Sequence, residues 1–222
     1  MTEPDLSSDY ALRTEAFHHG DFSATVVLPA SSDELIDENE FDADERLPYW
    51  AELWPSAQAL ARVLLSDTEL FGPALELGAG IGLPSLALLH RGIPVLTTDY
   101  YAEALRFARH NAAVNGLGPL ATRHLDWRNR TEGLEQFPLV LAADVLYERR
   151  NADALEALLP GVVAPGGSFL LADPGRVYLN VFLTQMSAAR WSIETLPERV
   201  EPSPAGKGLQ VKVRLFRLRP PA

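Results

Sequence analysis

The sequence contains no cysteine among its 222 residues. Disulfide bonds, a thiolate nucleophile and a cysteine-ligated zinc ion are therefore excluded. It also lacks any run of about eighteen apolar residues, which predicts that no helix spans a membrane. Residues 1–10 contain three acids and no apolar stretch, so they do not predict a secretory signal. We expect a cytoplasmic protein without a membrane partner.

Basic residues are scarcer than acidic ones, with 19 Lys and Arg against 30 Asp and Glu and a formal net charge of −11. Eight of the acids, and no base, lie between residues 31 and 45, so subtracting them from −11 leaves −3 for the rest of the chain. The charge therefore disfavours a nucleic-acid partner, which needs clustered Lys and Arg, only weakly. We interpret residues 31–45 as a solvated loop. The alternative is a segment that attracts a basic substrate or covers a site.

From residue 73 onward, short apolar runs alternate with stretches of helical periodicity. The runs predict strands at residues 74–77, 94–99, 121–125, 139–143 and 168–172, followed by two more near 191–196 and 210–218. The stretches between them predict helices over residues 83–89, 102–114, 152–159 and 177–188. Continuous apolar strands that alternate with helices are typical of a parallel sheet covered on both faces.

The predicted fold is therefore α/β: a Rossmann-like, doubly wound, seven-stranded sheet that ends in an antiparallel C-terminal hairpin. We assign residues 47–222 to this domain, in which a further helix begins at Pro55. Residues 1–46 are predicted to be an N-terminal extension, with short strands around residues 24–28 before the acidic loop.

A glycine-rich turn follows the first predicted strand, with Gly78, Gly80 and Gly82 leading into a helix. Glycine allows a positive φ and lets backbone N–H groups approach a ligand, although many such turns only let a helix pack near a strand. Asp99 ends the second strand, 21 residues after Gly78. A carboxylate there can accept hydrogen bonds from both ribose hydroxyls of a nucleoside. The turn and Asp99 together predict a nucleoside-binding site.

Glu76 lies inside the first strand, which is otherwise apolar. A buried acid is costly unless it is paired, and a cofactor that carries an ammonium group is one way to pair it. The diphosphate of a dinucleotide would be repelled by this acid. Glu76 therefore favours an adenosyl cofactor with an ammonium group over NAD.

Polar and aromatic residues also follow the third and fourth strands. Asp126 and Trp127 offer a carboxylate for an adenine amino group and a flat apolar face. After the fourth strand, Asp144 and Tyr147 are three residues apart and can converge on one group if a turn forms there. The alternative is that Asp144 caps the next helix.

Four stretches of the sequence match a known pattern: Trp54-Pro55-Ser56-Ala57, Glu76-Leu77-Gly78-Ala79-Gly80-Ile81-Gly82-Leu83, Leu125-Asp126-Trp127 and Ala143-Asp144-Val145-Leu146-Tyr147. With them the chain resembles the class I, seven-strand methyltransferases. More narrowly, it resembles methyltransferase family 16, which contains protein lysine methyltransferases and bacterial relatives. The last stretch matches the Asp-x-x-Tyr motif of that family.

The resemblance implies that S-adenosylmethionine is the cofactor, with S-adenosylhomocysteine as the product. No metal is expected, because a metal-assisted enzyme would need clustered acids around Asp144 and the following Glu148 is not enough. Asp144 and Tyr147 would face the acceptor nitrogen as the catalytic pair. The residues that would border the cofactor lie mostly at strand ends: Trp54, Glu76, Gly78, Ala79, Gly80, Asp99, Asp126, Trp127 and Ala143.

The resemblance implies N-methylation of a lysine side chain in a protein substrate. A small-molecule amine as acceptor, or a cofactor-binding module without catalysis, stays open as an alternative. Nucleic-acid methylation is disfavoured because no Asn-Pro-Pro-Tyr-type motif follows the fourth strand. We expect acceptor choice to depend on the loops at residues 31–50, 173–180 and 198–209.

Overall fold

The computed structural model describes residues 6–31, 35, 48–127, 134–206 and 208–221. All eight acids of the predicted loop at residues 31–45 lie outside the described residues. No helix in the described ranges is long and apolar enough to cross a membrane.

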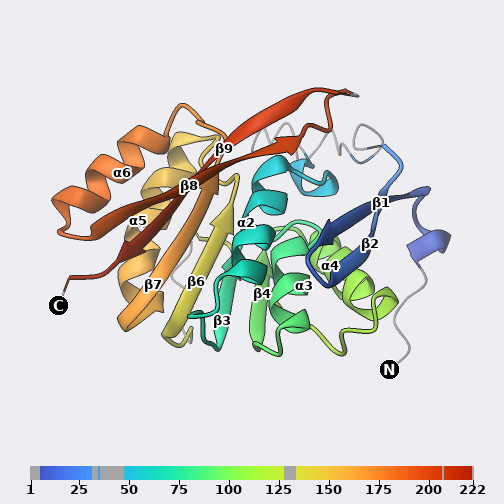
Figure 1. The fold of residues 1–222 in the computed structure, drawn as a ribbon, viewed down its shortest axis with the longest axis horizontal. Helices are drawn as coiled ribbons and strands as arrows, with labels where there is room; N and C mark the ends of the chain where they lie inside the picture. Colours follow the sequence, from blue (N-terminus) through green and yellow to red (C-terminus); the bar gives the residue numbers. More distant parts are fainter. Residues whose placement is uncertain (1–5, 32–34, 36–47, 128–133, 207, 222) are drawn as a thin grey trace.

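Seven strands form one sheet in the order β5-β4-β3-β6-β7-β9-β8 (Figure 1). The first five strands of the sheet are parallel, β9 is antiparallel to β7, and β8 is antiparallel to β9. The doubly wound sheet with an antiparallel C-terminal hairpin is confirmed. The strands are β3 (Ala74–Leu77), β4 (Val95–Asp99), β5 (Ala121–His124), β6 (Phe137–Ala143), β7 (Val163–Asp173), β8 (Ser192–Pro202) and β9 (Gln210–Arg219).

The strand order reverses between β3 and β6. The chain runs outward from β3 through β4 to β5 and then returns to the other side of β3 to form β6. Sheets of this kind bind ligands beyond the carboxyl ends of the strands at such a reversal. The fold therefore points to the edge where β3 and β6 end.

Helices cover both faces of the sheet, as Figure 1 shows. Along β6, Leu139 and Leu141 join a core with α2, α3 and α4, whereas Val140 and Ala142 join a second core with α5 and α6. This alternation explains why the strand is apolar at consecutive positions. The helices are α2 (Pro55–Ser66), α3 (Leu83–His90), α4 (Ala102–Val114), α5 (Arg149–Val162) and α6 (Leu179–Ala188), with the short 3-10 turns η1 (Leu6–Ser8) and η3 (Tyr49–Ala51).

The fifth predicted strand begins earlier in the structure than the sequence predicted. The segment at residues 165–167 was expected to be a turn in front of that strand, but β7 already begins at Val163. Phe137 of β6 pairs with Val163 and Leu139 then pairs with Ser168, so the register shifts across the segment. The Pro-Gly-Gly turn is therefore an irregularity inside the strand.

An N-terminal hairpin, β1 (Leu12–His19) and β2 (Phe22–Pro29), packs beside α4. The short strands predicted around residues 24–28 are confirmed within β2. Asn111 of α4 binds the backbone of Val27 on both sides: the N–H of Val27 donates to Oδ1 at 2.8 Å, and Nδ2 donates to the Val27 carbonyl at 3.1 Å. Nδ2 also donates to the carbonyl of Ile81 in the glycine turn at 3.1 Å. One buried side chain thus joins the hairpin, α4 and the turn.

We expect Asn111→Ala to lower the free energy of unfolding by roughly 2–4 kcal/mol, because it leaves buried backbone groups without partners. Asn115 makes the matching contacts to Thr25 at an exposed place, so Asn115→Ala is the control and should cost less. Urea unfolding measures both variants. Equal losses would contradict the role given to Asn111.

Candidate active site

A pocket lies at the carboxyl edge of the sheet, around the ends of β3, β4, β5 and β6. The segment that leads into α2 forms another wall, through Tyr49, Trp50 and Glu52. The structure brings all of the predicted site residues into the lining of this pocket: Trp54, Glu76, Gly78, Ala79, Gly80, Asp99, Asp126, Trp127, Ala143, Asp144 and Tyr147. Their convergence is a structural finding, whereas their individual roles stay predictions.

The glycine turn has no room for side chains. Gly80 has a φ of +53°, and a Cβ atom there would lie 3.2 Å from the carbonyl oxygen of Trp50. Gly78 has a φ of +65°, and its Cβ would lie 3.0 Å from a methyl group of Val145. Both positions therefore require glycine, and the turn presents its backbone to the pocket.

Asp99 holds the turn from the neighbouring strand. The N–H of Gly80 donates to Oδ2 of Asp99 at 2.8 Å, and the N–H of Tyr101 donates to Oδ1 at 2.9 Å. Burial raises the pKa of Asp99, while these backbone hydrogen bonds lower it. Each carboxylate oxygen has a second lone pair, so Asp99 can still accept hydrogen bonds from a ligand.

Glu76 is almost completely buried, at 2% exposure. The hydroxyl of Ser85 in α3 donates to its Oε2, and the hydroxyls of Ser85 and Thr97 are 2.6 Å apart. Burial raises the pKa of Glu76 to about 8, and the charge of Asp99 acts in the same direction. The sequence indicated that Glu76 needs a partner, and the hydrogen bond from Ser85 provides part of it. A cation in the pocket would favour the ionised form of Glu76.

Trp127 and Asp126 follow β5 and reach the same pocket. The position of a Cβ on Gly78 would be 3.3 Å from the Trp127 ring, which therefore lies against the glycine turn. The Trp127 side chain is partly buried against the core that includes Leu77 and Leu125. The ring offers a flat apolar surface beside the turn, as its place after the strand indicated.

Asp144 follows β6 in an unusual backbone conformation, with a φ of 58°. Its N–H donates to the carbonyl of Ala172 at 2.9 Å, and its Oδ1 accepts a hydrogen bond from Nε of Arg176 at 2.7 Å. Oδ2 is buried and has no hydrogen-bond donor among the described residues. The alternative that Asp144 caps the next helix is wrong, because α5 begins at Arg149 with Glu148 at the N-cap.

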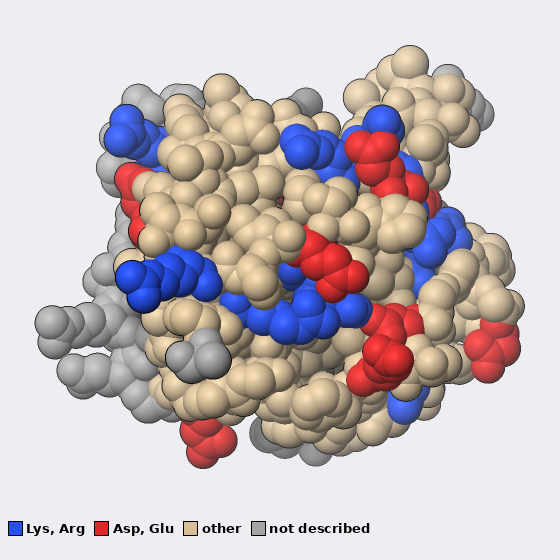
Figure 2. Space-filling view, turned by 60° about the vertical axis from the view of Figure 1, so that its left-hand side comes forward, with Lys and Arg blue, Asp and Glu red and all other residues tan. Residues whose placement is uncertain are grey.

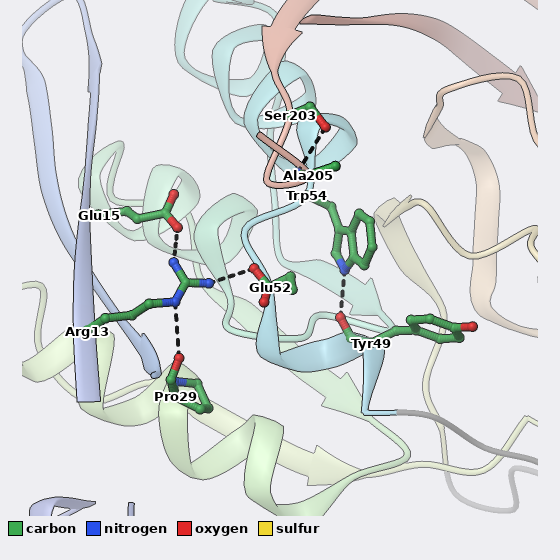
Figure 3. A network of polar contacts seen from close by, with 8 residues as sticks. All are labelled: Arg13, Glu15, Pro29, Tyr49, Glu52, Trp54, Ser203 and Ala205. Atoms are coloured by element: carbon green, nitrogen blue, oxygen red, sulfur yellow. Dashed lines mark hydrogen bonds and ion pairs between the residues drawn. The ribbon is translucent and has the colours of Figure 1, made fainter. Parts of the chain in front are cut away.

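Three aromatic side chains stand near Asp144. The ring of Tyr49 is 5.2 Å from that of Tyr147 and 6.2 Å from that of Trp54, in edge-to-face arrangements. The indole N–H of Trp54 donates to the carbonyl of Tyr49 at 2.6 Å (Figure 3). Tyr49 and Trp54 come from the segment that leads into α2 and Tyr147 from the loop after β6, and together the three rings give one end of the pocket an aromatic lining.

The N-terminal hairpin is tied to this lining. Arg13 of β1 donates to Oε2 of Glu52 at 2.6 Å and to the carbonyl of Pro29 at 3.2 Å, and it also pairs with Glu15 (Figure 3). Glu52 lies in the pocket wall between Tyr49 and Trp54. The hairpin therefore anchors the segment that carries both rings.

Sequence reasoning missed several residues in or beside the site, among them Tyr49, Ser85 and Arg176. Tyr49 and Arg176 fall in loops that the sequence assigned to acceptor choice, but neither was singled out. The polar position in an otherwise apolar helix was the available signal for Ser85. For Arg176 the available signal was Asp173, an acid that ends the fifth strand just as Asp144 stands at the end of the fourth.

The sheet order, the glycine turn after β3 and the acid that ends β4 define the class I methyltransferase fold. A solved structure of a putative RNA methyltransferase from Pyrococcus horikoshii has the same fold, with a TM-score of 0.60 and 15% identity over 78% of this chain and 89% of that one. The model of methyltransferase family 16, described as lysine methyltransferase, matches residues 47–188. The chain belongs to this family of S-adenosylmethionine-dependent enzymes.

Two relatives illustrate the range of the similarity. The chain is 32% identical to the electron transfer flavoprotein beta subunit lysine methyltransferase of Rattus norvegicus, over 68% of this chain and 60% of that protein. It is 29% identical to the histone-arginine methyltransferase METTL23 of Homo sapiens, over 65% of this chain and 75% of that protein. The matched region thus spans less than two thirds of the rat relative.

We expect the stability of the ligand-free protein to depend on pH through Glu76. Its pKa is about 8 in the folded protein against an ordinary value of 4.5, so the folded state holds the proton more tightly. The stabilisation from this group is complete below pH 4.5 and is lost as the pH rises through 8. Relative to Glu76→Gln, the free energy of unfolding should fall between these limits by on the order of 1.4 kcal/mol per pH unit. Urea unfolding of both proteins at several pH values measures the difference, and parallel profiles would refute the assignment.

Proposed function

We propose that this protein transfers a methyl group from S-adenosylmethionine to the ε-amino group of a lysine in another protein. The proposal rests on one observation: a single pocket has two chemically different ends. Asp99 and Trp127 provide polar and flat apolar contacts suited to a nucleoside, whereas Asp144 with Tyr49 and Tyr147 provides contacts suited to an amine. Membership of the lysine methyltransferase family supports the same conclusion.

The residues at the first end fit the chemistry of the cofactor. Glu76 is a buried acid whose ionised form a bound ammonium would stabilise, and the backbone cradle at Gly78 and Gly80 would be filled by any side chain there. Asp99 would accept the ribose hydroxyls, and Asp126 and Trp127 would border the adenine. Ala79 and Ala143 would complete the wall. When bound, the cofactor supplies an electrophilic methyl group on a sulfonium.

The residues at the second end fit an amine. A lysine arrives as an ammonium and must lose a proton to solvent before its lone pair can attack in line with the breaking carbon–sulfur bond. Aromatic faces attract a cation, so Tyr49 and Tyr147 would guide the ammonium while keeping water out. Trp54, expected to border the cofactor, packs against Tyr49 and would complete the pocket. Oδ2 of Asp144 would accept a hydrogen bond from the nitrogen and position it. In this proposal Asp144 orients the nitrogen and is not a strong base.

A protein acceptor is favoured over the alternatives by the family and by the rat relative, whose name gives the electron transfer flavoprotein beta subunit as its substrate. A nucleic-acid acceptor is disfavoured because many basic side chains are paired: Arg217 and Arg219 with Glu194, and Lys212 with Glu198. In the view of Figure 2, most basic groups border acidic ones. A cytoplasmic location stays a prediction from the sequence.

The proposal is tested by incubating the protein with tritiated S-adenosylmethionine and purified electron transfer flavoprotein beta subunit. Parallel reactions use a cell lysate before and after removal of small molecules and nucleic acid. We expect label in a protein band, and tandem mass spectrometry should place it on lysine. Label on arginine would correct the residue type. Label only in the small-molecule fraction would favour the amine alternative, and cofactor binding without any label would favour a non-catalytic module.

We expect Asp144→Asn to reduce turnover by about a hundredfold, since it removes the charged acceptor that positions the nitrogen. The affinity for S-adenosylhomocysteine, measured by calorimetry, should be unchanged. Asp153→Asn, at an exposed position of α5 that pairs with Arg149, is the matched control and should retain full activity. Full turnover by Asp144→Asn would show that the role assigned to Asp144 is wrong.

A further inference from the structure

Asp144 already forms an ion pair with a cation of the protein itself, Arg176. Nε of Arg176 lies 2.7 Å from Oδ1, with the Asp144 side chain 4% exposed and the Arg176 side chain 36% exposed. The Arg176 guanidinium carbon also lies 5.7 Å from the centre of a Trp54 ring. Arg176 therefore sits at the amine end of the pocket, in contact with two residues that line it.

A tight turn after β7 fixes the position of Arg176. The buried carboxylate of Asp173 accepts hydrogen bonds from the N–H groups of Gly175 and Arg176, both at 2.7 Å. Gly175 has a φ of +96°, which this turn needs. Ala143 and Ala172 are paired neighbours at the ends of β6 and β7. The turn after β7 thus places the side chain of Arg176 against Asp144, which follows the neighbouring strand β6.

Arg176 is the cation that balances the negative charge of the acids around it. Asp173, from β7, and the hydroxyl of Tyr49, from η3, interact electrostatically with Arg176 in addition to Asp144. Burial raises the pKa of Asp173, the charge of Asp144 raises it further, and Arg176 lowers it. The pocket's other acids belong to other elements: Glu52 pairs with Arg13, Glu76 lies in β3, Asp99 ends β4 and Asp126 follows β5.

The contact also gives the two carboxylate oxygens of Asp144 different surroundings. Arg176 occupies Oδ1 through a single N–H, whereas Oδ2 has no donor among the described residues. A buried carboxylate oxygen without a donor is costly, and such an atom in a pocket calls for an N–H group from a ligand. The ion pair therefore leaves one oriented oxygen for the acceptor nitrogen.

We propose that Arg176 is a positioning residue that stays on Asp144 during turnover, orients Oδ2 towards the acceptor and neutralises the carboxylate so that the amine can lose its proton. The inference rests on the proposed methyl transfer. A lone carboxylate beside an ammonium favours the charged form and opposes loss of the proton. A neutral ion pair holds the amine as well as the ammonium, so the proton leaves to solvent, the nitrogen–carbon bond forms and sulfur keeps the electron pair of the broken bond.

The test compares Arg176→Gln, which removes the charge but keeps an N–H donor, with Arg176→Lys, which keeps the charge. Arg219→Gln, at the opposite end of the sheet, is the matched control. The variants are assayed on electron transfer flavoprotein beta subunit across the pH range, after calorimetry with S-adenosylhomocysteine has shown that each binds the cofactor product. For Arg176→Gln we expect kcat to fall about tenfold or more, KM for the acceptor to fall or stay unchanged, and the acidic limb of the kcat profile to move up by about one pH unit.

Arg176→Lys should return the acidic limb towards that of the wild-type protein, and Arg219→Gln should not move it. Loss of kcat in both Arg176 variants without any movement of the limb would show a merely structural role and overturn the inference. An unchanged profile in Arg176→Gln would overturn it as well. A wild-type protein that labels no protein at all would refute the proposed function itself, and this inference with it.

Discussion

Four carboxylates are buried along one edge of the sheet, at or near the ends of β3, β4, β6 and β7, and each needs a partner there. They belong to Glu76, Asp99, Asp144 and Asp173. An isolated buried charge costs several kcal/mol or more, so a fold that keeps four of them must supply hydrogen bonds or cations. The Ser85 hydroxyl donates to Glu76, backbone N–H groups donate to Asp99 and Asp173, and the Arg176 guanidinium donates to Asp144.

These different partners give each acid a different chemistry. Glu76 accepts a hydrogen bond from the Ser85 hydroxyl and has a raised pKa, so a cation beside it would favour its ionised form. Asp99 instead accepts hydrogen bonds from backbone N–H groups, one of them in the glycine turn. Asp144 keeps one oxygen without a donor among the described residues, at the aromatic end of the pocket. In the proposed function, the ammonium of the cofactor would lie beside Glu76 and that of the acceptor beside Asp144.

The hairpin outside the sheet supports this arrangement. Arg13 holds Glu52 and with it the segment that carries Tyr49 and Trp54, while Asn111 connects β2 to the glycine turn. The hairpin and α4 thus fix two walls of the pocket, the segment before α2 and the glycine turn. The N-terminal part of the chain contributes to the site through contacts that no motif in residues 1–46 indicated.

Much of the fold could be predicted because its elements are long and periodic. The helix predicted over residues 102–114 has these bounds in the structure, and each buried strand was visible as an apolar run. Most of the site residues were found because they directly follow those runs, whereas Glu76 lies inside one and Trp54 precedes a helix. The start of β7 was misplaced, since glycine and proline at residues 165–167 indicate a turn whether it precedes a strand or interrupts one.

The partners of the buried acids could not be predicted in the same way. The contact between Arg176 and Asp144 spans 32 residues of sequence and depends on β6 and β7 being neighbours with matched ends. The contact between Ser85 and Glu76 depends on how α3 lies on the sheet. Periodicity gives the elements, but such side-chain distances follow only from packing.

The central claim is that the pocket holds an adenosyl cofactor with its ribose on Asp99. Calorimetric titration of S-adenosylhomocysteine into the wild-type protein and Asp99→Asn, with NAD as a competitor, tests it most directly. The structure predicts binding that weakens at least about tenfold in the variant, as expected for loss of a charged hydrogen-bond acceptor, and that NAD does not displace. Equal affinity in the two proteins, or displacement by NAD, would contradict the claim.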